Sequence, residues 1–234
     1  MFCFIFEVLP GAGRKEEYLN LVEYLKPTLE TMDGYVGSER FESCLRSGWM
    51  LSLQTWRDEK SVVRWRTEAE HHAIQVRGRF ETFADYHIRG GDVTSDTDPP
   101  TEAPIHQLRF DETEIGKGKL VTFTEMAPAR GVSLSPAGLP SRLGLAIHDG
   151  GLIGHDIYES IYNPGKMALL VAWRDANAAD RWVPRTMADG ISSLRHRKIR
   201  VIRDYGRFDR REAPQFYPDV EGRPNLHATS ARRS

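Results

Sequence analysis

Two similar stretches of the chain decide its fold. Residues 37–65 read GSERFESCLRSGWMLSLQTWRDEKSVVRW, and residues 154–182 read GHDIYESIYNPGKMALLVAWRDANAADRW. They align without a gap at an offset of 117, and 11 of the 29 positions are identical. Composition alone would give about two such matches, so the alignment indicates a tandem repeat.

The flanking residues extend each copy to about 90 residues with small changes in offset. Glu7 aligns with Glu125 at 118, and the pair Asp85-Tyr86 aligns with Asp204-Tyr205 at 119. We therefore expect a first unit at residues 1–91 and a second, diverged unit at 118–208. An acidic, proline-containing linker at 92–117 and a polar C-terminal tail at 209–234, expected to be poorly ordered, complete the chain.

The first unit shows the periodicities of a ferredoxin-like βαββαβ motif. Alternating or β-rich runs predict strands, and apolar residues at helical spacing predict helices. In chain order these are Phe2–Leu9, Glu16–Met32 (helix), Tyr35–Ser43, Met50–Trp56, Ser61–Arg79 (helix) and Phe83–Arg89. In the second unit, the segment matching the first helix contains Pro136, Gly138, Pro140 and Gly144, which predicts a shortened, irregular helix.

Composition excludes several classes of protein. The 32 Lys and Arg residues nearly balance the 33 Asp and Glu residues, so no field of one sign attracts nucleic acid. No apolar run approaches the roughly 20 residues of a membrane helix, and the N-terminus lacks the basic start of a secretory signal, which favours a cytoplasmic protein. The 2 cysteines and the spacing of the 8 histidines predict no disulfide framework and no metal site.

The first unit resembles the antibiotic biosynthesis monooxygenase family of dimeric α+β barrels. The resemblance rests on FEVLPGAGRKEEYLNL, DGYVGSERFES, LSLQTWRDEKSVVRWR, EHHAIQVRGR and FADYHIR, and the second unit is similar through GHDIYES and MALLVAWRD. It implies an α+β fold in which two tandem ferredoxin-like units form a barrel as a pseudo-dimer within one chain. Association of two such chains into a further homodimer is left open.

Trp65 and His72 are the first candidate site residues. They lie seven residues apart, so on one continuous helix they would share a face, two turns apart. The resemblance implies that this face lines a pocket, with His72 as the heme ligand in heme-degrading members of the family. A core tryptophan beside a satisfied histidine fits the same spacing, and a shift of one residue in the alignment would exchange His72 with His71.

Cofactor-free oxygenation, the family's other chemistry, requires a base, an oxyanion donor and a dry pocket. His72 is the candidate base, Trp65 Nε1 or Arg89 the donor, and Tyr86 a residue that orients the substrate ring. The sequence therefore predicts a monooxygenase that oxidises a small aromatic or polyketide-like substrate with O2 in the first-unit pocket, most simply with no cofactor. The alternatives are a non-catalytic barrel that binds heme or a hydrophobic metabolite, and a heme-degrading monooxygenase.

Overall fold

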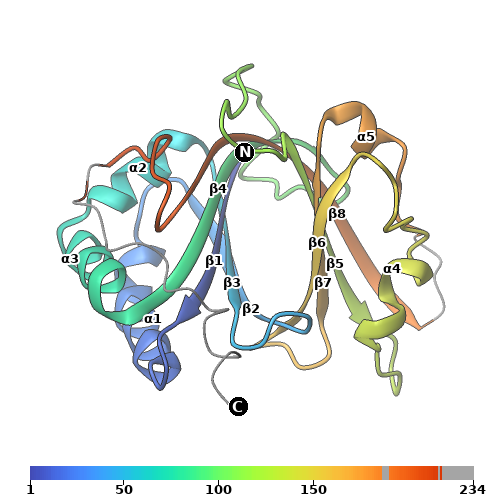
Figure 1. Ribbon diagram of the computed structural model, residues 1–234, viewed down its shortest axis with the longest axis horizontal. Coiled ribbons are helices and arrows are strands. Elements are labelled where there is room, and N and C mark those ends of the chain that lie inside the picture. The colour runs from blue at the N-terminus through green and yellow to red at the C-terminus, as the bar shows by residue number, and fades with distance from the viewer. Residues whose placement is uncertain (186–189, 216, 218–234) are drawn as a thin grey trace, which may run out of the picture.

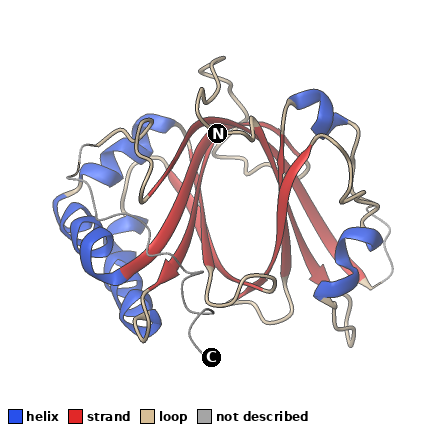
Figure 2. Ribbon diagram, viewed as in Figure 1, coloured by secondary structure: helices blue, strands red, loops and turns tan. Residues whose placement is uncertain are grey.

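The computed structural model describes residues 1–185, 190–215 and 217, and its eight strands close into one antiparallel barrel. Around the barrel the strands follow the order β1-β3-β2-β6-β7-β5-β8-β4. All helices lie on its outer surface, with α1, α2 and α3 over the strands of the first half and α4 and α5 over those of the second (Figures 1 and 2). In the described part of the chain, no helix has the length and apolar character needed to cross a membrane.

The first half of the chain has the predicted strands but a divided second helix. Its elements are β1 (Phe2–Pro10), α1 (Lys15–Glu30), β2 (Tyr35–Ser43), β3 (Met50–Trp56), α2 (Glu59–Thr67), α3 (Ala69–Arg77), a π-helical turn (Gly78–Thr82) and β4 (Phe83–Asp96). Asp58 caps α2 by accepting a hydrogen bond from the Ser61 amide at 2.8 Å. β4 continues to Asp96, so the start of the predicted linker at residue 92 is strand rather than loop.

The second half repeats the strands with much shorter helices. Its elements are β5 (Leu120–Pro128), a 3-10 turn (Pro136–Gly138), α4 (Leu139–Arg142), β6 (Leu152–Ser160), β7 (Met167–Trp173), α5 (Ala176–Asp180) and β8 (Ile191–Gly206). The predicted irregular helix is thus confirmed as a single turn, α4. Asp175 caps α5 as Asp58 caps α2, accepting from the Ala178 amide at 2.7 Å.

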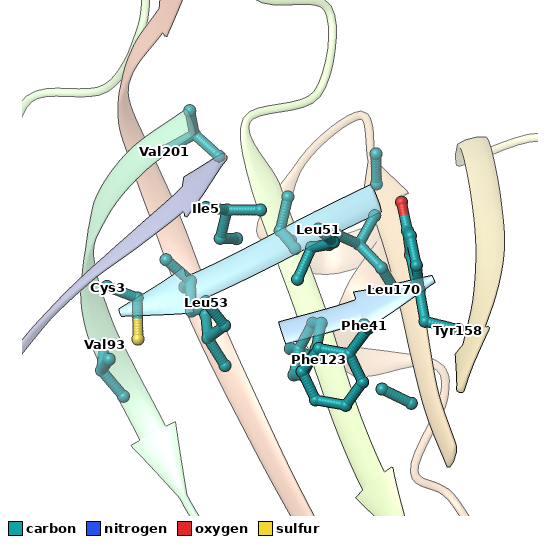
Figure 3. Close-up of a cluster of buried hydrophobic side chains, with 14 of the residues drawn as sticks. Cys3, Ile5, Phe41, Leu51, Leu53, Val93, Phe123, Tyr158, Leu170 and Val201 are labelled. Carbon is teal, nitrogen blue, oxygen red and sulfur yellow. The ribbon is translucent and has the colours of Figure 1, made fainter. Parts of the chain in front are cut away.

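Strand alternation assigns side chains to two separate environments. On β1, Cys3 and Ile5 are fully buried in the barrel interior, whereas Phe4 and Phe6 point outward beneath the helices. Figure 3 shows the interior cluster, in which side chains from opposite walls of the barrel converge, including Leu53, Phe123 and Val201. The centre of the barrel is therefore a packed apolar core.

Buried ion pairs accompany this core in each half of the chain. Glu7 pairs with Arg89, and Glu125 pairs with Arg197. The strand registers make the pairs equivalent: Arg89 lies opposite Ile5 on β1, and Arg197 lies opposite Phe123 on β5, two residues before each glutamate. The retained glutamates Glu7 and Glu125 thus serve the framework of the barrel.

Two seams join the halves, and they differ in length. β4 and β8 pair from His87 opposite Gly206 to Asp96 opposite Arg197. β2 and β6 pair only over Phe41 to Ser43. Along the long seam, a Cβ added to Gly91 would lie 2.0 Å from the Arg200 carbonyl oxygen, so only glycine allows this approach of the backbones.

The register corrects one part of the predicted alignment. Tyr86 on β4 lies opposite Val8, and the residue in the same relation on β5 and β8 is Leu194, opposite Met126. Tyr205 instead pairs with Ile88 across the long seam. The shared Asp-Tyr dipeptides therefore occupy different places in the two halves, because a short sequence match does not fix the register of a long strand.

Candidate functional site

A cavity of about 130 Å³ lies in the first half between the outward face of the sheet and helices α1 to α3. Its walls are mainly apolar and aromatic, and residues of the C-terminal segment complete it. The lining residues used below are Tyr18, Arg40, Ser52, Trp65, Arg66, His71, Ile74, Arg79, Tyr86, Arg210 and Tyr217. Concave, mostly apolar sites with a few polar groups are typical of small-molecule binding.

Trp65 brings an unused hydrogen-bond donor to this cavity. The side chain is 2% exposed, and its Nε1 has no hydrogen-bond partner among the described residues. Ser52, on the facing strand β3, is 3% exposed, and its hydroxyl also lacks a partner within the described chain. Because an unpartnered buried polar group costs about 1–3 kcal/mol, two at one cavity indicate a ligand that satisfies them.

The second half provides an internal comparison. Trp182 aligns with Trp65, but its Nε1 donates a hydrogen bond to the Leu143 carbonyl at 3.2 Å. Leu169, which aligns with Ser52, is a fully buried apolar residue. The equivalent space is packed by a cluster of buried hydrophobic side chains that includes Leu139. The two free polar groups are thus specific to the first half.

His71, and not His72, lines the cavity. Its Nδ1 lies 2.8 Å from the Trp65 carbonyl oxygen, and its ring stacks on the Trp65 indole at 3.9 Å between centroids. A carbonyl can only accept, so Nδ1 carries the proton and Nε2 is the basic nitrogen. Burial lowers the pKa of the imidazole to about 4, so His71 is neutral at neutral pH.

The expected placement of His72 on the face of Trp65 is wrong. Glu68 adopts an extended conformation, and its carboxylate caps α3 by accepting from the His71 amide at 2.8 Å. This break resets the helical phase between Trp65 and the histidines. His72 is consequently exposed and outside the cavity lining, and its Nδ1 lies 3.3 Å from the Tyr217 hydroxyl.

Tyr86 lies at the cavity as predicted, held by two guanidinium groups. Its hydroxyl oxygen accepts a hydrogen bond from Arg79 Nη1 at 2.8 Å and another from Arg210 Nη1 at 3.0 Å. These contacts fix the tyrosine ring beside Phe6 and Phe83. Tyr86 is therefore a fixed part of the cavity wall, and its predicted role in orienting a substrate ring stays a prediction.

Arg89 does not belong to this cavity. The odd-numbered residues of this part of β4 face the barrel interior, and Arg89 forms its ion pair with Glu7 there. The guanidinium beside Glu7 counteracts burial and, together with His87 and Arg46, lowers the pKa of that carboxyl to about 2. Of the two donors predicted from the sequence, only Trp65 lines the cavity, because strand alternation puts Arg89 on the other face.

Heme does not fit the residues present. The cavity of about 130 Å³ is close to the roughly 150 Å³ of an apolar cavity that binds benzene, and a porphyrin is several times larger. The imidazole that would ligate iron lies flat against Trp65, with 14° between the two ring planes.

Comparisons with known proteins agree with this architecture. Residues 1–77 match the family model described as antibiotic biosynthesis monooxygenase. Over 223 residues, the chain is 39% identical to the jasmonate monooxygenase ABM of Pyricularia oryzae, covering 93% of this chain and 99% of that protein.

Among solved structures, an aldoxime dehydratase shares the fold with a TM-score of 0.53 at 11% identity, over 86% of this chain and 80% of that one. An anthrone oxidase-like protein matches 92% of this chain and 96% of its own at 12% identity, with a TM-score of 0.34. The extent and identity of the match to the Pyricularia oryzae protein, together with the family model over residues 1–77, establish that the chain is a monooxygenase and belongs to the antibiotic biosynthesis monooxygenase family.

Proposed function

We propose that the first-half cavity oxygenates a small ring-containing substrate with O2 and without a cofactor. The observation that carries this proposal is the pair of unpartnered groups, Trp65 Nε1 and the Ser52 hydroxyl, beside the neutral imidazole of His71. Two hydrogen-bond donors and one base around an apolar space are the groups that forming and holding an organic anion requires.

In this proposal, His71 Nε2 removes a proton from an acidic C–H or phenol of the substrate. The resulting oxygen anion accepts hydrogen bonds from Trp65 and Ser52. Such donors are most effective when water is excluded and the groups are already in place. The low pKa of free His71 rises when an anion binds beside it, since the negative charge favours the imidazolium.

For a substrate with a methylene next to a carbonyl, the atoms and electrons of this oxygenation balance. The substrate anion passes one electron to O2, the radical pair forms a C–O bond, and the peroxide loses water as its O–O bond breaks. One methylene and one O2 thus become one new carbonyl and one water, and the substrate supplies all the electrons. No external reductant is needed for this class of substrate.

The volume of the cavity and the substrate named for the related enzyme both favour a substrate with a single ring. A volume of about 130 Å³ accommodates one ring. The relative's name identifies jasmonate, a cyclopentanone carboxylic acid, as a compound to test first. Cyclic 1,3-diketones and monocyclic phenols represent the polyketide-like and aromatic classes predicted from the sequence.

We further propose that the halves derive from a duplicated ferredoxin-like unit and that the second is a scaffold. The equivalent registers of β1 with β3 and of β5 with β7 support the common origin, since Trp56 and Trp173 end both pairings. The satisfied indole of Trp182 and the apolar Leu169 support the loss of chemistry there. The strands of the second half are needed to close the barrel, which is the structural role proposed for that half.

Oxygen uptake with the three substrate classes tests the proposal, using ¹⁸O2 to trace the incorporated atom. Trp65→Phe keeps an aromatic side chain, though a smaller one, and removes the donor, and we expect it to lower kcat by about 10²-fold to 10³-fold. Trp182→Phe is the matched control and should retain activity. Turnover that is unchanged in Trp65→Phe would overturn the role of the cavity.

Hemin titration of the purified protein tests the heme alternative. The cavity predicts no stoichiometric Soret shift. A saturable shift that His71→Ala abolishes would instead establish a heme-binding barrel, and decay of that band on reduction under oxygen would make it a heme-degrading enzyme. Saturable binding of the ring compounds with no oxygen uptake would leave a non-catalytic metabolite binder.

A further inference from the structure

Arg66 is a buried cation at the cavity with no acidic partner among the described residues. It is 6% exposed, its Nη2 donates to the Gln215 side-chain oxygen at 2.7 Å, and its Nε has no partner in the described chain. Its guanidinium lies 5.3 Å from the centroid of the Phe4 ring and 5.7 Å from that of Tyr205. Neutral groups thus hold Arg66 in place without compensating its charge.

Arg210 brings a second guanidinium to the same place. Its Nη2 donates to the Gln215 carbonyl at 2.9 Å, and its Nε is buried and unpartnered within the described chain. The guanidinium lies 5.5 Å from the centroid of the Tyr205 ring, which Arg66 also contacts, and 5.0 Å from that of Tyr217. Both guanidinium groups act to lower the pKa of the Tyr217 hydroxyl, against the larger opposite effect of burial.

Two adjacent cations without an anion are costly in a partly dehydrated site. Charges taken from water are normally paired, since the loss of hydration otherwise costs several kcal/mol each. Two other buried arginines follow this rule, Arg89 with Glu7 and Arg197 with Glu125. The second half has no counterpart of this cluster: Val183, which aligns with Arg66, is 70% exposed.

We infer that Arg66 and Arg210 form a carboxylate-binding subsite of the cavity, which selects ring compounds bearing an acidic side chain. The inference deepens the proposed function, since it uses the same cavity. Guanidinium groups present paired N–H donors that match the two oxygens of a carboxylate. Tyr86 lines the same cavity and its hydroxyl accepts a hydrogen bond from Arg210, so a carboxylate bound at Arg210 would also set the orientation of a ring beside this tyrosine.

The experiment compares the affinities of jasmonic acid and its methyl ester by isothermal titration calorimetry under anaerobic conditions. The two ligands share the ring and differ in the charge. We expect the acid to bind about 10- to 100-fold more tightly, the range for hydrogen bonds to a charged group. Arg66→Met should abolish this preference, and Arg66→Lys should retain part of it. Equal affinities for acid and ester in the wild type would overturn the inference.

Matched variants separate the subsite from other arginines. Arg64→Met is the control on the same helix, because Arg64 is exposed and pairs with Asp33. Arg210→Gln gives a second route if Arg66→Met fails to fold, since Arg210 lies in the C-terminal segment outside the barrel. Arg40 also lines the cavity, and loss of the acid preference in Arg40→Gln alone would place the carboxylate there and refute the assignment.

Two further experiments identify which anion the subsite binds and whether the chain itself supplies it. Inorganic phosphate that competes with the acid at equal concentration would indicate a general anion site and not a carboxylate site. Asp219→Asn with Glu221→Gln removes acidic groups of the tail, and a gain in ester affinity there would show that the chain supplies the anion itself. Acid preference without oxygen uptake would refute the proposed function alone, and uptake with equal acid and ester affinities would refute the subsite alone.

Discussion

The imidazole of His71 lies flat on the indole of Trp65, with 3.9 Å between ring centroids and 14° between planes. One residue thus supplies an unused N–H donor and the other an unprotonated nitrogen at the same wall of the cavity. The Trp65 carbonyl fixes the tautomer of His71, so the backbone of the donor residue orients the base. The two side chains are therefore held as one structural unit, and in the proposed reaction they would act together.

Exchange of the neighbouring histidines tests which of them is the base. His71→Gln should lower kcat by about 10²-fold to 10⁴-fold, the usual contribution of a positioned general base. His72→Gln should change kcat less than about twofold, since His72 is exposed and outside the cavity lining. Steady-state oxygen uptake measures both variants, and the reverse pattern would restore the assignment expected from a continuous helix.

The stability of the fold should fall as the pH falls from 7 to 5. Burial lowers the pKa of His71 and of His196 to about 4, so the unfolded chain, with a pKa near 6.5, binds protons first. Each histidine then costs about 2 kcal/mol of unfolding free energy over this range. Urea denaturation at both pH values measures the loss. Glu7 contributes outside the window, because its pKa of about 2 affects stability only below about pH 4.5.

The matching variants isolate these two residues. His71→Gln combined with His196→Asn should remove most of the pH dependence, whatever the absolute stability of the double variant. A pH dependence that persists in full would show that other groups, and not these histidines, protonate on unfolding.

Glu7→Gln should destabilise the barrel without acting on the chemistry. The variant leaves the buried Arg89 without its carboxylate, which costs about 3–5 kcal/mol for a buried pair. Glu42→Gln is the control, because its pair with Lys15 is exposed and contributes less than about 1 kcal/mol. Chemical denaturation gives both values. A folded Glu7→Gln protein with greatly reduced kcat would contradict the placement of Arg89 and Glu7 outside the catalytic cavity.

Gly91→Ala should disrupt the long seam between β4 and β8. The added methyl would meet the Arg200 carbonyl, a backbone atom that cannot turn away, and such overpacking costs about 1–3 kcal/mol or more. Gly37→Ala on β2 is the control, since no heavy atom lies within 4 Å of its added Cβ. Equal melting temperatures for the two variants would show that the seam tolerates the methyl.

Local periodicity predicted the strands well because the alternation of side chains and the turn residues that bound a strand depend only on residues close together in the sequence. The same reasoning placed Trp65 and Tyr86 at the cavity. It failed at His72, because a single extended residue, Glu68, divides what looks like one amphipathic run. The local sequence signal for this break is Thr67, because threonine competes with helical hydrogen bonding. In the structure its hydroxyl donates to the Val63 carbonyl just before the break.

The remaining site residues could not be found from local pattern. Ser52 lies in a strand whose residues are all buried, so alternation does not distinguish its outward face by polarity. Arg210 and Tyr217 come from the predicted tail, which composition marks as surface. Only folding brings that segment across α2 and α3, and residues 216 and 218–234 of the tail lie outside the described part of the chain.

The unequal lengths of the two seams also determine where the strands of the barrel separate most easily. The short seam carries Glu42 opposite Glu159, a like-charge pair that weakens an already brief pairing, whereas the β4–β8 seam is long. Amide protons that donate across the short seam, such as that of Cys44 to the Ile157 carbonyl, should therefore exchange with solvent before those that donate across the β4–β8 seam. Opening at β2 would also move Arg40, so thermal motion at a junction between the halves reaches the wall of the cavity.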